Sequence, residues 1–454
     1  MILDSWGRYP QTIADVLEPL DASALNRLVQ AHSSESNLIA RGAGRSYGDS
    51  ALAAKVISSR FLDSFIALDD ESGILHCGSG VSLDSVLKIA IAKELFLPVV
   101  PGSKFVTVGG AIAADVHGKN HHKHGSFCDH LVGFNVMLAS GEIVYCSDIE
   151  NSDLFHASCG GMGLTGIVVD AKIRLKKITS LQIERRTLVG ENLKDTLSLL
   201  EENNDSTYSV AWIDCLAKGD SLGRSLLFLG EHKENLRSGQ ADSKSSDFNI
   251  RAKPTFNVPF SMPSLLLNKF TLGTFNSAYF ELKSRLPKQD TTDFTSFFFP
   301  LDNIGQWNRL YGKAGFLQYQ FVVPTETGFE TISQVLTKVS DAGKGSFLSV
   351  LKKFGKHNRN WLSFPKEGFT LTLDFKRERS LFPLLDELDV IVHENGGRLY
   401  LAKDARMSEQ RFKQGYSNWE EFMQLKETID PKQLFRSLQS DRLGLTTAKA
   451  GTKK

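Results

Sequence analysis

The chain has 454 residues, more than a single hydrophobic core usually fills, so its length favours two domains. Hydrophobic residues make up 41% and charged residues 23%, as in an ordinary soluble globular protein. Because 53 basic side chains are balanced by 52 acidic ones, the net charge provides no field that would attract nucleic acid, and we expect no nucleic-acid partner.

The cysteines and the N-terminal segment bear on the cellular compartment. The chain has five cysteines, an odd number without C-x-x-C spacing, which argues against a disulfide framework and for a reducing compartment. The first residues have neither the basic nor the long apolar region of a secretory signal, and no uncharged run is long enough to span a membrane. We therefore expect a cytoplasmic protein.

The first organised segment is "SNLIARGAGRSYGDS", residues 36–50, which predicts a short strand followed by a loop with Gly42, Gly44 and Gly48. Glycine permits backbone conformations in which several N–H groups converge, an arrangement that suits a pyrophosphate. The loop departs from the G-x-G-x-x-G fingerprint, and the next residues predict short strands with a hairpin turn at Asp70 to Gly73. A nicotinamide-binding Rossmann domain is therefore disfavoured.

A helix and two further glycine-rich turns follow. Ser82 has the position of an N-cap, and the apolar residues after it have the spacing of one helical face; they are Leu83, Val86, Leu87, Ala90 and Ile91. The turns lie in "TVGGAIAADVHGKN" and in "HASCGGMGLTGIVVDAKIRL", which ends in an alternating strand. Three such turns within about 130 residues indicate one extended ligand bound between them.

The run "HGKNHHKHG" places four histidines within residues 117–125, and three interpretations are open. His117 and His121 have the spacing of a zinc-binding helix, but Gly118 and Asn120 disfavour a helix and no acidic residue of the HExxH type lies between them. The run could also be a polar surface loop, or one histidine could belong to a larger site. We predict no metal site.

Several motifs together resemble one flavoprotein family. They are "RGAGRSYGD", "PVVPGSKFVTVGGAIAADVHGKNHHKHGSF", "GGMGLTGI", "GKAGFLQYQFVVP" and "GGRLYLAKDAR". They are similar to the vanillyl-alcohol oxidase and p-cresol methylhydroxylase family, and within it to the branch of decaprenylphosphoryl-ribose oxidases. The resemblance extends from "SWGRYP" to "DPKQLFRSLQSDRL".

This resemblance implies an α+β fold: a two-domain, p-cresol-methylhydroxylase-type FAD-binding fold with an inserted substrate domain built on an antiparallel sheet. Residues 1–180 would form the FAD-binding domain, residues 181–397 the substrate domain, and residues 398–454 would return to the first domain. Within the insert, residues 243–275 mix polar residues, proline and apolar residues, a composition that suits either a mobile lid over a greasy substrate or a plain connector. The segment from Thr446 to Lys454 is expected to be disordered.

The cofactor implied by the resemblance is FAD. Arg45 stands where relatives with covalently attached flavin have histidine, so the resemblance implies a non-covalent complex. The residues expected to contact FAD are Arg41, Gly42, Ala43, Gly44, Arg45, Ser46, Tyr47, Gly48, Asp49, Gly102, Thr107, Val108, Gly109, Gly110, Ala114, Asp115, Val116, His117, Ile167 and Tyr400.

Two residues are predicted to be catalytic by the resemblance. His117 would lie close to the flavin ring, with the other histidines of its run orienting the loop or facing solvent. Lys403 matches the family lysine that reaches flavin and substrate; it could stabilise reduced flavin as an ammonium, act as a base with a lowered pKa, or be a surface lysine paired with Asp404.

Five residues are predicted to bind substrate: Tyr47, Gln318, Gln320, Lys352 and Thr372. Strand alternation places both glutamines on one face, suited to sugar hydroxyls or flavin edges. Lys352 is a candidate for the substrate phosphate or a solvated charge.

Two departures concern the substrate region. Mycobacterial members have cysteine at the position of Thr372, so thiol-directed nitroaromatic inhibitors should form no adduct here, and they have Tyr and His in place of Phe298 and Phe299.

The function that the resemblance implies is FAD-dependent oxidation of a secondary hydroxyl, expected to be the 2-hydroxyl of a polyprenylphosphoryl ribose, to a keto sugar. This step is the first half of an epimerisation to arabinose that an NAD(P)H-dependent short-chain reductase would complete. Val116 beside the flavin suggests poor access for oxygen and hence a quinone or another electron acceptor. The protein could also associate with the inner membrane surface, which would not require a membrane-spanning segment. The alternatives are a soluble alditol or aldonolactone oxidase of the same superfamily, and a flavin-binding scaffold without turnover.

Overall fold

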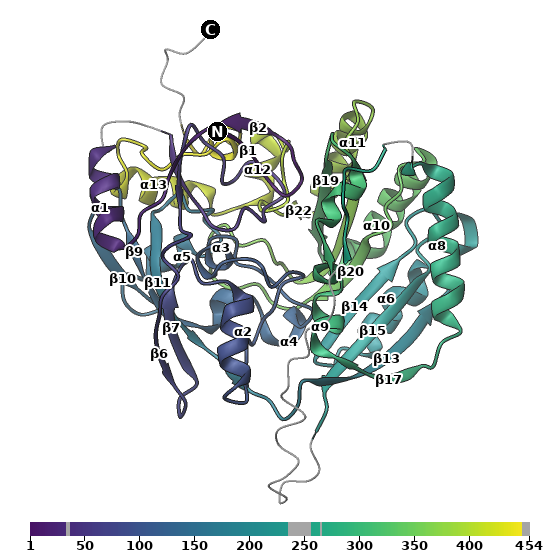
Figure 1. Ribbon diagram of the computed structural model, residues 1–454. Helices are drawn as coiled ribbons and strands as arrows, with labels where there is room; N and C mark the ends of the chain where they lie inside the picture. Colours follow the sequence, from purple (N-terminus) through teal and green to yellow (C-terminus); the bar gives the residue numbers. More distant parts are fainter. Residues whose placement is uncertain (33–36, 235–255, 264–265, 447–454) are drawn as a thin grey trace, which may run out of the picture.

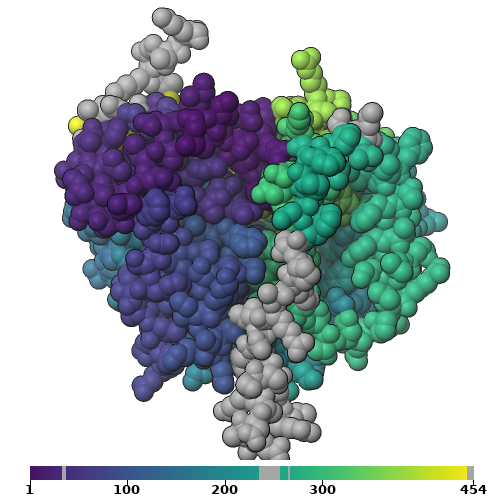
Figure 2. Space-filling model, in the orientation of Figure 1, coloured from purple at the N-terminus to yellow at the C-terminus, as the bar shows by residue number. Residues whose placement is uncertain are grey.

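The computed structural model describes residues 1–32, 37–234, 256–263 and 266–446. Two halves lie side by side: the N-terminal strands and helices form one, and a large sheet with its helices forms the other (Figure 1). The same division is visible on the surface, where the purple and blue N-terminal half lies against the teal and green half (Figure 2). The predicted α+β class with a large antiparallel sheet is confirmed.

The N-terminal half is built on two small sheets. The first is parallel, in the order β3 (Asp15–Leu17), β5 (Lys55–Ser58), β4 (Leu38–Arg41). The second is antiparallel, in the order β10 (Ile143–Cys146), β9 (Leu131–Met137), β11 (Ile167–Arg174), β7 (Ile74–Gly78), β6 (Phe65–Asp69). The helices of this half are α1 (Ala22–Ala31), α2 (Leu83–Ile91), α3 (Val108–Ala113), α4 (His121–His124) and α5 (Ser152–Ser158).

Local sequence patterns in this half form the structures that they predict. The Ser82 side chain accepts a hydrogen bond from the backbone N–H of Ser85 at 3.1 Å and begins α2. All five apolar residues of the predicted helical face are buried. Residues 70–73 connect the antiparallel strands β6 and β7, so the hairpin turn is also confirmed.

The other half is built on an eight-stranded sheet in which every neighbouring pair is antiparallel. Its order is β17 (Gln289–Asp293), β13 (Gln182–Gly190), β15 (Ser225–His232), β14 (Tyr208–Ile213), β20 (Ser349–Phe354), β21 (Gly368–Lys376), β19 (Phe316–Val323), β22 (Arg398–Leu399). Helices α6 (Leu193–Glu202), α10 (Thr325–Asp341) and α11 (Leu381–Glu394) cover one face, and α10 contacts the other two.

The opposite face of this sheet turns toward the N-terminal half, and alternation in β21 shows how the sequence divides the two faces. Leu371 and Leu373 are fully buried in the core shared with α10 and α11. Thr372, between them, points the other way and lines a cavity. We call this the cavity face of the large sheet.

Three more segments complete the fold. Helices α8 (Lys269–Ser284) and α9 (Phe294–Phe298) border the cavity. The C-terminal helices are α12 (Glu409–Gly415), α13 (Trp419–Ile429) and α14 (Leu438–Arg442), of which α13 packs against α5. The short two-stranded sheets pair β1 (Ile2–Asp4) with β2 (Gln11–Ile13), β8 (Leu95–Phe96) with β12 (Lys176–Lys177), and β16 (Phe256–Asn257) with β18 (Ile304–Gly305).

Some predictions on organisation remain untested. The domain boundaries at 180/181 and 397/398 stay predictions. Residues 243–255 and 264–265 of the predicted lid and residues 447–454 of the predicted disordered tail lie outside the described residues. Within the described ranges, none of the helices has the length and apolar composition of a membrane span.

Candidate active site

A cavity of about 910 Å³ lies between the two halves. Its lining comes from the first glycine-rich loop, from α3 and the loop after it, from α8 and α9, and from the cavity face of the large sheet. This volume is near the upper end of the range for small-molecule sites, so the cavity has room for more than a single sugar.

The first glycine-rich loop presents free backbone donors to this cavity. Residues 43–46 line it, and none of their four N–H groups donates to a described residue. Neighbouring residues fix the loop: the Tyr47 N–H donates to the Ala402 carbonyl at 3.0 Å, and a Cβ on Gly48 would lie 1.7 Å from the Asp404 carbonyl oxygen. Glycine is therefore required for this close approach, and the loop fits an anionic group such as a pyrophosphate.

Two arginines add positive charge to the same loop. Arg41 donates to the Asp4 carbonyl at 2.7 Å, and the Arg45 guanidinium lies 4.2 Å from the centre of the Trp6 ring. Both line the cavity, and burial lowers the pKa of each. Together with the free N–H groups, their positive charge is suited to an anionic group.

His117, in the loop that follows α3, is buried and is held as a neutral imidazole. Burial, reinforced by the nearby positive charge of Lys352, keeps the pKa of His117 well below its usual range. The Gln320 amide donates to Nε2 of His117 at 3.1 Å, so the proton of the neutral ring is on Nδ1. Nδ1 is buried and has no partner among the described residues, which leaves one donor for a bound molecule.

The rings of His121 and His122 form hydrogen bonds with the protein. Nδ1 of His121 accepts a hydrogen bond from the Gly355 N–H at 3.2 Å, and burial lowers the pKa of His121 to about 3. Nε2 of His122 donates to the Ser206 carbonyl at 2.8 Å. Within the described part of the chain, no group of three His, Cys, Asp or Glu residues is arranged to hold a metal ion.

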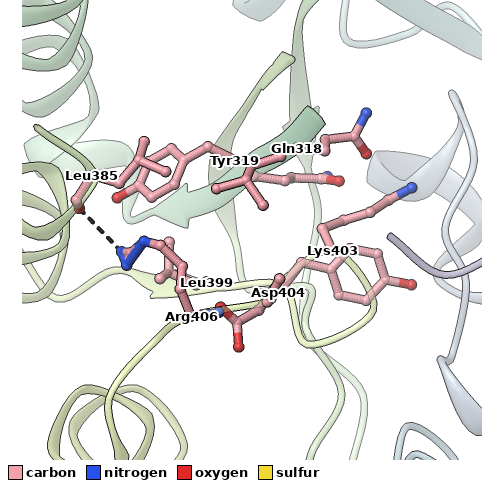
Figure 3. A pocket seen from close by; sticks show the side chains of 11 residues that line it. Gln318, Tyr319, Leu385, Leu399, Lys403, Asp404 and Arg406 are labelled. Carbon is pink, nitrogen blue, oxygen red and sulfur yellow. Dashed lines mark hydrogen bonds between the residues drawn. The ribbon is translucent and has the colours of Figure 1, made fainter. Parts of the chain in front are cut away.

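Lys403 lies among buried polar groups at the edge of the large sheet. Its ammonium is 3.7 Å from the centre of the Tyr47 ring, and burial lowers its pKa although the negative charge of Asp374 opposes the change. Burial raises the pKa of Asp374, whose Oδ1 accepts a hydrogen bond from the Gln318 amide at 2.5 Å. Figure 3 shows Lys403 and Gln318 extending to the same side, while Arg406 turns away toward the Leu385 carbonyl.

The register of four strands places one row of side chains on the cavity face. Gln320 of β19 is opposite Thr372 of β21, Thr372 is opposite Val350 of β20, and Val350 is opposite Trp212 of β14. Since directly opposed residues of antiparallel strands share a face, the row changes from hydrogen-bonding to apolar side chains along its length. All four residues line the cavity.

Comparisons with known proteins identify the family. Two family models match, an FAD binding domain over residues 14–147 and D-arabinono-1,4-lactone oxidase over residues 314–443. A decaprenylphosphoryl-beta-D-ribose oxidase of Mycolicibacterium smegmatis is 37% identical over 450 residues, which cover 98% of this chain and 97% of that relative. The chain belongs to the decaprenylphosphoryl-ribose oxidase-like family of FAD-binding oxidases.

Two other relatives show how far the similarity extends. An uncharacterized protein in the mprA 5' region of Streptomyces coelicolor is 30% identical over 377 residues, 80% of this chain and 100% of that protein. Delta(24)-sterol reductase of Pisum sativum is 32% identical over 134 residues, which cover 29% of this chain and 24% of the reductase. The family resemblance, the FAD-binding fold and the oxidoreductase class expected from the sequence are thus confirmed.

The structure brings most of the predicted site residues of this oxidase together in the cavity lining. They are Arg41, Gly42, Ala43, Gly44, Arg45, Ser46, Tyr47, Gly102, Thr107, Gly109, Gly110, Ala114, Val116, His117, Ile167, Gln318, Gln320, Lys352, Thr372, Tyr400 and Lys403. Phe298 also lines the cavity, whereas Phe299 is buried beside it. The prediction that both glutamines share one face is confirmed.

Four predicted cofactor residues do not line the cavity of the oxidase. Gly48 packs on Asp404 as described, and Val108 is buried in the core. Asp49 accepts two hydrogen bonds from Arg442, which also pairs with Asp404. Asp115 accepts hydrogen bonds from three side chains of the segment after β20: Asn358, Asn360 and Ser363. Their contacts stabilise the segments around the cavity, and their direct contact with FAD stays a prediction.

Three polar residues of the oxidase site were missed by the sequence interpretation. Asp374 follows Thr372 by two positions in β21, so strand alternation could have placed it on the same face. Lys119 lies within the histidine run, and the interpretation of that run considered only its histidines. Arg185 of β13 lines the same cavity from a distant strand, and no local signal points to it.

Proposed function

We propose that the protein oxidises the 2-hydroxyl of a polyprenylphosphoryl ribose to a keto sugar, as the first half of an epimerisation to the arabinose form. The observation that carries this proposal is the change of polarity along the cavity face, from Gln320 and Thr372 to Val350 and Trp212. A sugar fits the hydrogen-bonding end and a lipid the apolar end. The relative with 37% identity is named for a lipid-phosphate-linked ribose, which supports the same substrate class.

FAD fits the part of the cavity formed by the first glycine-rich loop. The free N–H groups of residues 43–46, with Arg41 and Arg45, would hold its pyrophosphate. When bound, FAD supplies the acceptor for the hydride that leaves the sugar carbon. We propose that it is bound non-covalently, because Arg45 stands in place of the histidine that attaches flavin in other relatives, and a guanidinium forms no such bond.

The protein's own residues orient the sugar and handle the hydroxyl proton. Gln318, Gln320 and Thr372 are suited to hold sugar hydroxyls by hydrogen bonds, and the Nδ1 proton of His117 is free to donate to the substrate or the cofactor. Lys403 has a lowered pKa because it is buried, so its amine could take the hydroxyl proton; as an ammonium it would instead stabilise negative charge.

The product would pass to an NAD(P)H-dependent short-chain reductase, which would complete the epimerisation. Val116 is buried and lines the cavity, so we propose that oxygen has poor access and that a quinone or another acceptor removes the electrons. A lipid-linked substrate also favours peripheral binding of the enzyme to the inner membrane surface, which does not require a membrane-spanning helix.

The test combines cofactor release and anaerobic bleaching. Acid precipitation of the yellow protein should release all FAD into the supernatant, and farnesylphosphoryl ribose should bleach the bound flavin under anaerobic conditions. Protein that keeps its flavin after denaturation would refute the non-covalent complex. Flavin that stays oxidised with farnesylphosphoryl ribose would refute the proposed substrate.

A second function is supported by the match to D-arabinono-1,4-lactone oxidase over residues 314–443. In that case free aldonolactones or alditols would bleach the flavin, and reoxidation by oxygen would produce peroxide. A protein that binds FAD and is bleached by none of these compounds would be the flavin-binding scaffold.

A further inference from the structure

The charges around the cavity are strongly unequal. Among the described residues that line it, one is acidic, Asp302, and six are always or often cationic. The six are Arg41, Arg45, Lys119, Arg185, Lys352 and Lys403. Because buried positive charge is costly without a partner, the excess indicates that the cavity accepts anions.

Lys119 and Lys352 are the two cations whose charge is least compensated. The Lys119 ammonium donates to the Phe297 carbonyl and lies 4.5 Å from the centre of the Phe297 ring, and its other two N–H donors have no acceptor among the described residues. Lys352 makes no hydrogen bond or ion pair with a described residue. Burial lowers the pKa of Lys119 to about 7 and that of Lys352 to about 8, and the positive charge of Lys352 further lowers the pKa of Lys119.

Arg185 adds a third cation near these lysines. It also lowers the pKa of Lys119 by repulsion, and it forms a two-point ion pair with Asp290 on the neighbouring strand. Its guanidinium lies 5.9 Å from the centre of the Phe228 ring, which lines the apolar part of the cavity. The cationic group is thus adjacent to the apolar lining.

Lys119, Lys352 and Arg185 form a second group of cations in the cavity lining, and the pyrophosphate of FAD does not account for it. The free N–H groups of residues 43–46 belong to the first glycine-rich loop, and so do Arg41 and Arg45. Lys119 follows α3 and Lys352 belongs to β20, where its charge acts on His117 and Lys403. The second group is therefore close to the residues that would meet the sugar.

We propose that Lys119 and Lys352, with Arg185 beside them, bind the monoanionic phosphodiester that joins the sugar to the lipid. This inference rests on the proposed function and names the residues that select its substrate class. The phosphodiester would lie between the sugar, held near His117 and Lys403, and the lipid, which would contact Trp212 and Phe228. A free sugar would leave both lysines without a counter-charge, so the group discriminates against it.

The site also couples phosphodiester binding to proton uptake. An anion raises the pKa of both lysines, and a phosphodiester itself does not titrate near neutral pH. The other titratable groups that interact with the pair are the cations Arg185 and Lys403 and the imidazoles of His117 and His121, which are neutral, and Asp290 compensates Arg185. Affinity should be constant below pH 7 and should fall as the pH rises through the free-state pKa values of about 7 and about 8.

The experiment measures binding of methyl farnesyl phosphate to the FAD-loaded enzyme by calorimetry, with farnesyl methyl ether as the uncharged comparison. Lys352→Met and Lys119→Met should each weaken binding of the phosphodiester about tenfold to a hundredfold, because each removes a charged hydrogen bond. Binding of the ether should be unchanged. Lys353→Met and Lys123→Met are matched controls, since Lys353 pairs with Glu201 and Lys123 donates to the Asp205 carbonyl.

Measurements on the unaltered enzyme keep the inference testable if a lysine variant fails to fold. Near pH 8, where the free lysines are partly deprotonated, phosphodiester binding should take up protons, measured in buffers of different ionisation enthalpy, and the affinity should weaken further above pH 8. Binding without proton uptake, no binding, or equal affinity of the lysine variants and their controls would overturn the inference. If the phosphodiester binds as described but farnesylphosphoryl ribose does not bleach the flavin, the proposed function fails and the anion site stands.

Discussion

At the scale of single residues, burial and charge act in opposite directions on Asp374 and Lys403. Burial favours the neutral form of both groups, whereas their mutual attraction favours the charged pair. Gln318 donates to the Asp374 carboxylate and lies beside the same cavity. Asp374 is therefore a positioning residue whose negative charge favours the protonated form of Lys403.

Asp374→Asn tests this control and also separates the two roles of Lys403. The amide keeps an acceptor for Gln318 but removes the negative charge that raises the pKa of Lys403, so that pKa should fall. If Lys403 acts as a base, the rate of anaerobic flavin reduction rises with pH, and the variant should show this rise at lower pH. If Lys403 acts as an ammonium, the rate falls with pH, and that fall should move to lower pH.

The matched control for this change is Asp341→Asn, which alters an exposed ion pair with Lys218. It should leave the pH profile unchanged. An unchanged profile in Asp374→Asn would contradict the electrostatic role of Asp374.

A second residue-scale prediction concerns thiol-directed nitroaromatic inhibitors. Thr372 lines the cavity, whereas all five cysteines are buried, and burial raises the pKa of each thiol. Intact-mass spectrometry should therefore find no adduct after incubation of the active enzyme with inhibitor and substrate. Thr372→Cys should gain the mass of one inhibitor, and an adduct on the unaltered enzyme would contradict the prediction.

At the scale of elements, α8 has apolar side chains that line the cavity and others that are exposed to solvent. Leu272, Phe275 and Tyr279 line the cavity, at spacings that place them on one side of the helix. Phe270 is 82% exposed and Leu282 is 64% exposed. Phe275 lines the cavity and is itself 47% exposed, so apolar surface of α8 extends from the cavity to solvent, which suits a membrane from which a lipid substrate enters.

Phe270→Asp should reduce the fraction of protein that sediments with phospholipid vesicles. The change places a charge where an aromatic ring would enter the interface, and the formal net charge of +1 leaves little electrostatic attraction to compensate. Phe329→Asp is the control, since Phe329 is 49% exposed on α10 at the opposite face of the large sheet. Equal losses in both variants, or none in Phe270→Asp, would contradict membrane contact through α8.

The elements differ in how much of them the sequence could predict. Helix α2 and the β6–β7 turn follow from neighbouring residues, such as the Ser82 cap, so local patterns were sufficient. The row from Gln320 to Trp212 depends on the register of strands far apart in the chain, which no local pattern specifies. The resemblance implies that Asp49 and Asp115 contact the cofactor, and only the structure shows their side-chain partners, Arg442 for Asp49 and Ser363 for Asp115.

At the scale of the whole molecule, both halves of the protein contribute residues to the lining of the cavity. The first glycine-rich loop touches the C-terminal segment through Tyr47 and Ala402, and His117 meets Gln320 of the large sheet. A cofactor that fills the space between the halves adds contacts to both. FAD should therefore stabilise the folded chain as a whole.

Removal of FAD by acid or chaotrope, followed by refolding, should lower the melting temperature, and reconstitution should restore it. A ligand at a hundred times its dissociation constant adds about 2.7 kcal/mol to the free energy of unfolding, because it binds only the folded state. Scanning fluorimetry at increasing FAD concentration should show a melting temperature that rises steadily beyond saturation. Riboflavin, which lacks the pyrophosphate that residues 43–46 are suited to hold, is the matched ligand and should stabilise far less. Equal stabilisation by riboflavin would show that the glycine-rich loop contributes little to binding, and a melting temperature independent of FAD would contradict a cofactor bound between the halves.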